Sequence, residues 1–174
     1  MTDWRAVILK IEPTAKPWIV DGIVDAMPIV IERYTINTPL RQQHFLGTLA
    51  HESDHFHTTV EYASGAAYEN RKDLGNLYRG DGKRFKGRGL IQLTGRANYA
   101  AAAQEFKTDF IEEPDLVSRF PWALVVSAWW WRNHDLNEVA DKDNCEQVCR
   151  IVNGGTNGLQ SRIDLTRLAG EALA

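Results

Sequence analysis

TPLRQQHFLGTLAHE, residues 38–52, has the pattern of a helix that ends at a carboxylate. Thr38 is a favoured N-cap residue, and Pro39 suits the first helical turn because the N–H that proline lacks would have no partner there. Phe45 and Glu52 are two helical turns apart, so we expect Glu52 on the apolar stripe and not on the wet face. The stretch therefore predicts a helix with a partly buried carboxylate at its C-terminal end.

Helical patterns dominate the chain on both sides of this stretch. A proline within a helix removes a backbone hydrogen bond and clashes with the preceding turn, so we expect Pro28 to divide one helix from the next. Gly154 and Gly155 are expected to stop another, since glycine commonly follows the last turn. The expected helices cover residues 3–11, 18–27, 29–34, 38–52, 96–106, a segment that Pro121 opens, 145–152 and 159–174.

The segment from Thr58 to Gly89 has a different character. It contains six glycines and no sustained periodicity, and we expect loops and a short β-hairpin there. A long irregular run inside a domain is more often functional than idle. The sequence thus predicts a mainly α-helical domain with a long loop-rich insert.

The charge is unevenly distributed along the chain. Eight basic and two acidic residues lie between Arg71 and Arg96, a balance of +6. Because the whole chain carries −3, the remainder carries −9. A local basic patch on an acidic protein favours an anionic or polar polymer at one site, and not general affinity for nucleic acid. The alternative is an ordinary solvated loop.

Length and composition exclude several classes of protein. A chain of 174 residues with 44% hydrophobic residues fits one domain, residues 1–174, that needs no structural metal or disulfide to fold. Cys145 and Cys149 are four apart in a predicted helix, so we expect free thiols. No apolar run approaches the roughly 20 residues that cross a bilayer, and MTDWRAVILKIEP does not resemble a signal peptide. We expect a soluble protein that starts in the cytoplasm.

The pentapeptide His51-Glu52-Ser53-Asp54-His55 satisfies the H-E-x-x-H pattern of zinc peptidases. The long form of that motif needs a glycine at position 58 and a histidine at position 61, where this chain has Thr58 and Glu61. Glu61 or Glu69 could in principle supply the third ligand. A zinc peptidase is therefore the alternative from a different class of enzyme.

Two carboxylates near the start of the insert could divide acid and base roles. Glu52 could protonate a leaving oxygen, while Glu61 activates water on the opposite face of a sugar–sugar bond. Glu61 could equally be an ordinary surface carboxylate. GRGLIQLTGRANY, residues 87–99, has glycines that let backbone approach a ligand and neutral groups that suit sugars, and it matches no phosphate-binding motif.

Four blocks in order resemble the catalytic domain of glycoside hydrolase family 19. They are HES (51–53), GRGLIQLTGRANY (87–99), EPDLVSRFPWALVVSAWWW (113–131) and IVNGG (151–155). Within that family they are most similar to compact phage endolysins and related bacterial lysozyme-like enzymes. The resemblance implies a lysozyme-like, two-lobed helical fold with a cleft, and inverting hydrolysis of β-1,4 bonds between N-acetylated sugars without a cofactor or metal.

The resemblance also implies roles for individual residues. Glu52 matches the general acid, Glu61 the presumed general base with Glu69 in reserve, and Thr94 the residue that helps to hold the attacking water. The matching substrate-binding positions are Gln92, Asn98, Tyr99, Asn153 and Arg162, the last a late arginine that braces the acidic residues. Plant chitinases carry a glutamate shortly after the N-G-G stretch, where this chain has Thr156-Asn157-Gly158, which favours the shorter endolysin pattern.

The expected partner is the glycan strand of bacterial peptidoglycan, with chitin as the alternative substrate and a catalytically silent glycan-binding module as a third reading. We expect a monomer that acts from the host bacterial cytoplasm, reaches the wall with help from a holin-like permeabilising protein, and neither binds nucleic acid nor inserts stably in a membrane. Sugar-stacking rings are expected in the insert, whereas the helical tryptophans are expected in the core. The insert rings are Tyr62, Tyr68, Tyr78 and Phe85.

Overall fold

The computed structural model describes residues 2–174, and helix α3 (Pro39–Glu52) lies at the centre of its larger lobe. The Thr38 hydroxyl accepts a hydrogen bond from the Arg41 amide at 3.2 Å, which confirms the expected N-cap. Helix α3 packs closely along α9 (Leu159–Leu173), because a Cβ added at Gly47 would lie 2.7 Å from the Thr166 Cα. This contact fixes the end of α3, where Glu52 lies, against the C-terminal helix.

The prediction of a mainly α-helical fold is confirmed. Residues 2–174 form nine α-helices and three short 3₁₀ helices. Besides α3 and α9, the α-helices are α1 (Trp4–Ile11), α2 (Pro17–Arg33), α4 (Asp81–Arg84), α5 (Arg96–Phe106), α6 (Trp122–Asn133), α7 (Leu136–Ala140) and α8 (Cys145–Asn153). The 3₁₀ helices are η1 (Ala66–Tyr68), η2 (Lys72–Leu74) and η3 (Pro114–Ser118).

The expected break at Pro28 is wrong, since α2 runs through this residue to Arg33. Proline in a helix interior costs about 3 kcal/mol. Seven residues along α2 are buried, and burying each large apolar side chain stabilises by about 1.5–3 kcal/mol. The continuous apolar face therefore outweighs the lost hydrogen bond. The buried residues are Ile19, Val20, Gly22, Ile23, Ala26, Met27 and Val30.

The insert is loop-rich, as expected, but the predicted hairpin is reduced to isolated pairing. Val60 bridges Arg88, and Arg88 bridges Leu93, with no longer ladder between them. The remainder of the insert consists of η1, η2, the one-turn helix α4 and turns. Backbone hydrogen bonds in turns and between loops, such as that from the Glu61 amide to the Gly87 carbonyl at 3.0 Å, hold this segment together with side-chain hydrogen bonds.

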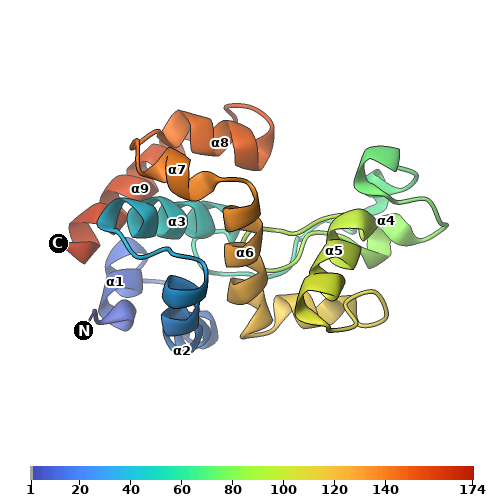
Figure 1. Ribbon diagram of the computed structural model, residues 1–174, viewed down its shortest axis with the longest axis horizontal. Coiled ribbons are helices and arrows are strands. Elements are labelled where there is room, and N and C mark those ends of the chain that lie inside the picture. Colours follow the sequence, from blue (N-terminus) through green and yellow to red (C-terminus); the bar gives the residue numbers. More distant parts are fainter. Residues whose placement is uncertain (1) are drawn as a thin grey trace.

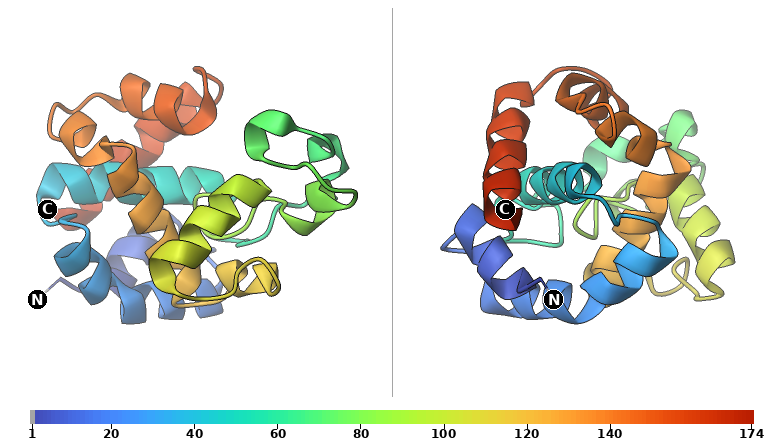
Figure 2. Two further views of the ribbon diagram at one scale, coloured as in Figure 1. Left: turned by 45° about the vertical axis from the view of Figure 1, so that its right-hand side comes forward. Right: turned by 60° about the vertical axis from the view of Figure 1, so that its left-hand side comes forward.

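The two-lobed architecture is confirmed by two separate hydrophobic cores. The larger core joins α1, α2, α3, α6, α7, α8 and α9, and the smaller one joins the insert, α5 and the segment before α6. Helix α6 contributes to both, with Trp131 in the larger core and Val126 in the smaller one. Figure 1 shows α6 between the two lobes, and the insert with α4 and α5 on the right. The turned views in Figure 2 keep this separation.

Two further expectations concern the chain as a whole. Cys145 and Cys149 are free thiols, as predicted. Among residues 2–174, no helix is both long and apolar enough to cross a membrane.

Candidate active site

Glu52 ends α3, and the chain turns sharply after it. The Ser53 hydroxyl donates to the Leu49 carbonyl at 2.7 Å and accepts from the Phe56 amide at 3.0 Å, which caps the helix. Asp54, His55 and Phe56 then have φ values of 49°, 57° and 60°. Three non-glycine residues in left-handed conformation are strained, so the turn depends on contacts around it.

Arg162 of α9 holds the Glu52 carboxylate. Its Nη2 donates to Glu52 Oε1, and the arginine side chain is only 2% exposed. The remaining Arg162 atoms Nε and Nη1 are buried without a hydrogen-bond partner among the described residues. A cation fixed against one carboxylate oxygen leaves Oε2 for proton transfer, and it stabilises the negative charge that remains afterwards.

His51 lies beside this pair. Its Nδ1 is 3.0 Å from the Ser161 hydroxyl, and a Cβ added at Gly158 would lie 2.6 Å from its ring. Burial, together with the positive charge of Arg162, lowers the pKa of His51 to about 4. The imidazole is therefore neutral near pH 7, so it adds no second positive charge next to Glu52.

The Glu61 carboxylate is held on both oxygens by neutral donors. The Tyr68 hydroxyl donates to Oε1 at 2.9 Å, and the Gly87 amide donates to Oε2 at 3.0 Å. A Cβ added at Gly87 would lie 3.2 Å from Glu61 Oε2 and 2.8 Å from the Gln92 side-chain oxygen. Glycine at this position therefore leaves room for the Glu61 and Gln92 side chains, which a larger residue would displace.

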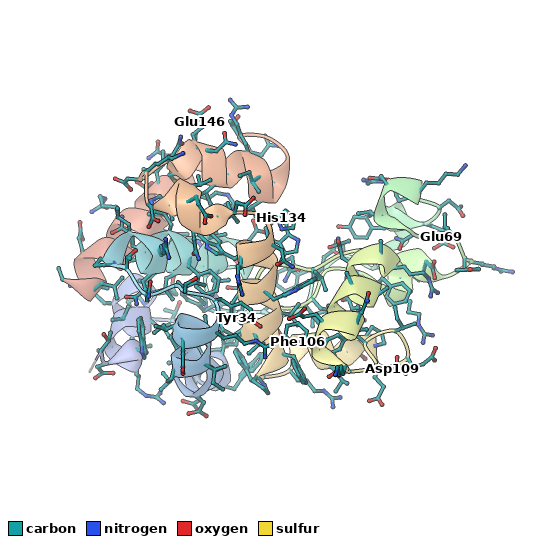
Figure 3. The ribbon with its side chains drawn as sticks, viewed as in Figure 1. Tyr34, Glu69, Phe106, Asp109, His134 and Glu146 are labelled. Carbon is teal, nitrogen blue, oxygen red and sulfur yellow. The ribbon has the colours of Figure 1, made fainter. Side chains whose placement is uncertain are left out.

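Glu69, the reserve second carboxylate, is hydrogen-bonded to the backbone of the insert. It accepts hydrogen bonds from the Gly80 amide at 2.7 Å and the Gly82 amide at 2.9 Å. These backbone hydrogen bonds lower the pKa of Glu69. Figure 3 shows Glu69 in the smaller lobe, beside the insert loops. These contacts tie Glu69 to the backbone of the insert, whereas Glu61 accepts from Tyr68 and Gly87.

The block from Gly87 to Asn98 forms a chain of side-chain-to-backbone hydrogen bonds. Gln92 Nε2 donates to the Gly89 carbonyl at 3.0 Å, and Thr94 Oγ1 donates to the Gln92 carbonyl at 2.8 Å. Asn98 Nδ2 then donates to the Thr94 carbonyl at 2.7 Å. All three side chains are partly exposed, so their free lone pairs can accept from a ligand or a water.

Three residues expected to contact substrate are buried instead: Arg162, which holds Glu52, and the rings of Tyr99 and Phe85. Tyr99 is fully buried, and its hydroxyl donates to the Lys86 carbonyl at 2.8 Å and accepts from Arg88 Nη1 at 3.1 Å. Burial raises the pKa of Tyr99 to about 12. Phe85 packs against it with ring centroids 5.2 Å apart and is also fully buried. The predicted substrate role of Tyr99 and the predicted stacking role of Phe85 are therefore wrong, because both rings build the smaller core.

The other predicted positions lie at the surface. Asn153, the last residue of α8, is exposed and donates to the Asn157 carbonyl at 3.2 Å. Tyr62 and Tyr78 are 74% and 63% exposed. The helical tryptophans pack against the two cores, as expected.

The H-E-x-x-H pattern does not form a zinc site. Helix α3 ends at Glu52, so His51 and His55 are not on one helical face. His51 contacts Ser161, whereas His55 Nδ1 lies 3.2 Å from Glu12 Oε2. Within residues 2–174 there is no group of three or more histidine, cysteine or acidic residues that could hold a metal ion.

Sequence reasoning missed the residues that hold the insert in place. Asp81 is buried and accepts from the Leu77 and Tyr78 amides at 3.1 and 3.0 Å. It also pairs with Arg96 at 2.7 Å, and the Arg96 hydrogen bond lowers the pKa of Asp81. The buried Asn76 side chain donates to the Tyr68 carbonyl at 2.9 Å. Nothing in the sequence pattern marks these long-range pairs.

The structure thus has two lobes, two carboxylates held by different partners, and a block of partly exposed polar side chains. The profile of glycoside hydrolase family 19, described as chitinase class I, matches residues 43–155. The chain belongs to this family.

Relatives of known sequence and structure agree with this assignment. A glycosyl hydrolase family 19 domain-containing protein of Haemophilus influenzae is 29% identical over 182 residues, covering 87% of this chain and 89% of that protein. A Pisum sativum endochitinase is 32% identical over 110 residues, which cover 57% of this chain but only 34% of the plant protein. Chitinase C of Streptomyces griseus HUT6037 has the same fold, with a TM-score of 0.76, 20% identity, and coverage of 99% of this chain and 78% of that one.

Proposed function

We propose that the chain is an endolysin that hydrolyses β-1,4 bonds between the N-acetylated sugars of bacterial peptidoglycan, with inversion at the anomeric carbon. Glu52 protonates the glycosidic oxygen as its bond to the anomeric carbon breaks. Glu61 takes a proton from the water that attacks that carbon from the opposite face, and Thr94 helps to hold this water. Gln92, Asn98 and Asn153 bind the sugars.

The family match supports hydrolysis of a glycosidic bond, and the acid and base roles follow the resemblance of Glu52 and Glu61 to the family's two carboxylates. The contacts at each carboxylate fix its position. Arg162 holds Glu52 and stabilises the negative charge that remains once the proton has left. Among the described residues, Glu61 accepts from two neutral donors, Tyr68 and Gly87, and keeps lone pairs free for a water proton.

The choice of peptidoglycan rests on the sequence resemblance to compact endolysins. In plant chitinases a glutamate follows N-G-G, whereas this chain has Thr156-Asn157-Gly158 at that place. Two side-chain nitrogens of Arg162 also lack a hydrogen-bond partner among the described residues. Less unpaired positive charge is available than the sequence predicts, because five of the eight cations between Arg71 and Arg96 have partners within the described residues. They are Arg71, Arg84, Lys86, Arg88 and Arg96.

Chitin is the second candidate substrate, which the names of the pea and Streptomyces relatives favour. Purified sacculi and chitin oligomers should be incubated separately with the protein, and the new reducing ends identified by mass. Muropeptide ends from sacculi support the proposal, whereas products from chitin alone overturn the choice of substrate. Proton NMR of the first product should show the inverted anomer, and the retained anomer would contradict the mechanism.

A further inference from the structure

Hydrogen bonds to polar side chains hold the backbone of the insert loop from Asn76 to Gly82. Asp81 accepts from two amides of this loop, and Glu69 accepts from two others. Asn76 is fully buried and ties the loop to Tyr68. Because these contacts fix the backbone, the side chains that point outwards are presented in a defined arrangement.

Two large apolar side chains are presented there. Leu77 and Tyr78 are each 63% exposed, and neither belongs to the two hydrophobic cores. The Arg96 guanidinium lies 4.8 Å from the centre of the Tyr78 ring and helps to orient it. Adjacent exposed apolar residues on a rigid loop contribute little to folding, and they indicate a contact with another surface.

The charge around this loop is positive. Lys72, Arg79 and Lys83 are exposed and have no ion-pair partner within residues 2–174. Of the acidic side chains nearby, Asp73 pairs with Arg71 and Asp81 pairs with Arg96. Glu69 accepts from the Gly80 and Gly82 amides and lies close enough to Lys83 for their charges to interact, while Lys72 and Arg79 have no such neighbour among the described residues. We refer to Leu77, Tyr78 and Arg79, with Lys72 and Lys83, as the insert tip.

We propose that the insert tip is a peripheral docking surface for an anionic lipid bilayer. The segment lies at the outer end of the smaller lobe in Figures 1 and 2, where it projects from the body. A projecting loop fits a flat surface, whereas a glycan strand or a peptide is bound in a groove. Leu77 and Tyr78 enter the boundary between headgroups and acyl chains, and the three cations face lipid phosphates. This contact is independent of hydrolysis.

Sedimentation with vesicles tests the proposal on the full chain. The protein should bind vesicles of phosphatidylcholine mixed with phosphatidylglycerol, bind phosphatidylcholine alone much less, and lose most binding at high salt. Arg79→Gln with Lys83→Gln should weaken binding about fivefold for each charge removed. Leu77→Ser with Tyr78→Ser should weaken it at low and high salt alike.

Matched substitutions outside the insert provide the controls. Ile29 is 51% exposed on α2, and Lys107 is an exposed cation after α5, so Ile29→Ser and Lys107→Gln should leave vesicle binding unchanged. Thermal melts should show that every variant folds. Equal binding to both kinds of vesicle, or equal binding by the tip variants and the wild type, overturns the proposal. So does a wild type that ignores the vesicles but needs the same residues to bind purified sacculi. If the protein binds anionic vesicles as expected but hydrolyses neither sacculi nor chitin, the proposed function is wrong and the docking proposal stands.

Discussion

Glu52 and Arg162 form a charged contact in which the cation is almost completely buried. Arg162 is 2% exposed, so removing its partner would leave a buried guanidinium without a counter-charge. A glutamine at position 52 keeps a carbonyl oxygen that can still accept from Arg162. This residue can therefore be tested for chemistry without removing the whole contact.

We expect Glu52→Gln to lower kcat on sacculi by about 10²–10⁴-fold, because an amide cannot donate the proton that a general acid supplies. Turnover and thermal melting should be measured on the same preparation. A folded variant with the wild-type kcat would contradict the acid role of Glu52.

Glu61 and Glu69 should respond differently to the same substitution. Glu61→Gln should lower kcat by about 10²–10⁴-fold with little effect on the urea midpoint, because the base is lost while both loop contacts can persist: the amide oxygen still accepts from the Gly87 amide, and the amide NH2 can donate to the Tyr68 hydroxyl, which can also act as an acceptor. Glu69→Gln should lower the urea midpoint and leave kcat of the folded protein near the wild-type value, because an amide cannot accept both backbone hydrogen bonds. The reverse pattern would assign the base to Glu69.

At the scale of elements, the turn at Gly87 lies beside both Glu61 and Gln92. It donates to Glu61 and leaves room for Gln92, which itself has a φ of 61°. No secondary structure of any length stabilises this segment, so its geometry depends on single contacts. Small changes of volume should therefore affect catalysis before they affect folding.

Gly87→Ala tests this dependence. The added methyl would lie 2.8 Å from the Gln92 oxygen and 3.2 Å from Glu61 Oε2, so both side chains must move. We expect kcat to fall by about tenfold or more, because a displaced catalytic group is no longer aligned with the substrate. Gly155→Ala is the matched control, since its methyl meets nothing within 4 Å, and its unfolding free energy should stay within about 0.5 kcal/mol of the wild type. Equal effects of both substitutions would rule out the positioning role of Gly87.

Elements with local signals could be predicted from the sequence. Thr38 and Pro39 mark the start of α3, and the helix over residues 96–106 has the bounds of α5. Long-range burial could not be predicted in this way. Helix α2 continues through Pro28 because its apolar face is buried, and Tyr99 lies in the smaller core although it follows the polar Asn98. The Tyr68 contact with Glu61 also depends on how the insert folds back, which no periodicity records.

At the scale of the whole molecule, the neutral His51 couples stability to pH. Its pKa is lowered from 6.5 to about 4 in the folded chain, so the unfolded chain binds the proton more tightly. The unfolding free energy should therefore fall as the pH decreases from about 6.5 to about 4, by at most about 1.4 kcal/mol per pH unit from this residue. Below that range both states are protonated, and this contribution changes no further.

Urea unfolding of the wild type and His51→Gln, measured at several pH values between 7 and 4, checks this linkage. Glutamine does not titrate, so the difference between the two unfolding free energies should narrow as the pH falls. Parallel curves would show that His51 is not the group responsible.

Helix α6 has neighbouring residues in opposite cores, with Val125 in the larger one and Val126 in the smaller one. A helix shared in this way resists rotation of one lobe against the other, because such a rotation would break the packing on one of its two faces. The relative position of the two lobes is therefore set when the chain folds. A substrate that touches residues of both lobes must fit them as they stand, without a large closing movement of the protein.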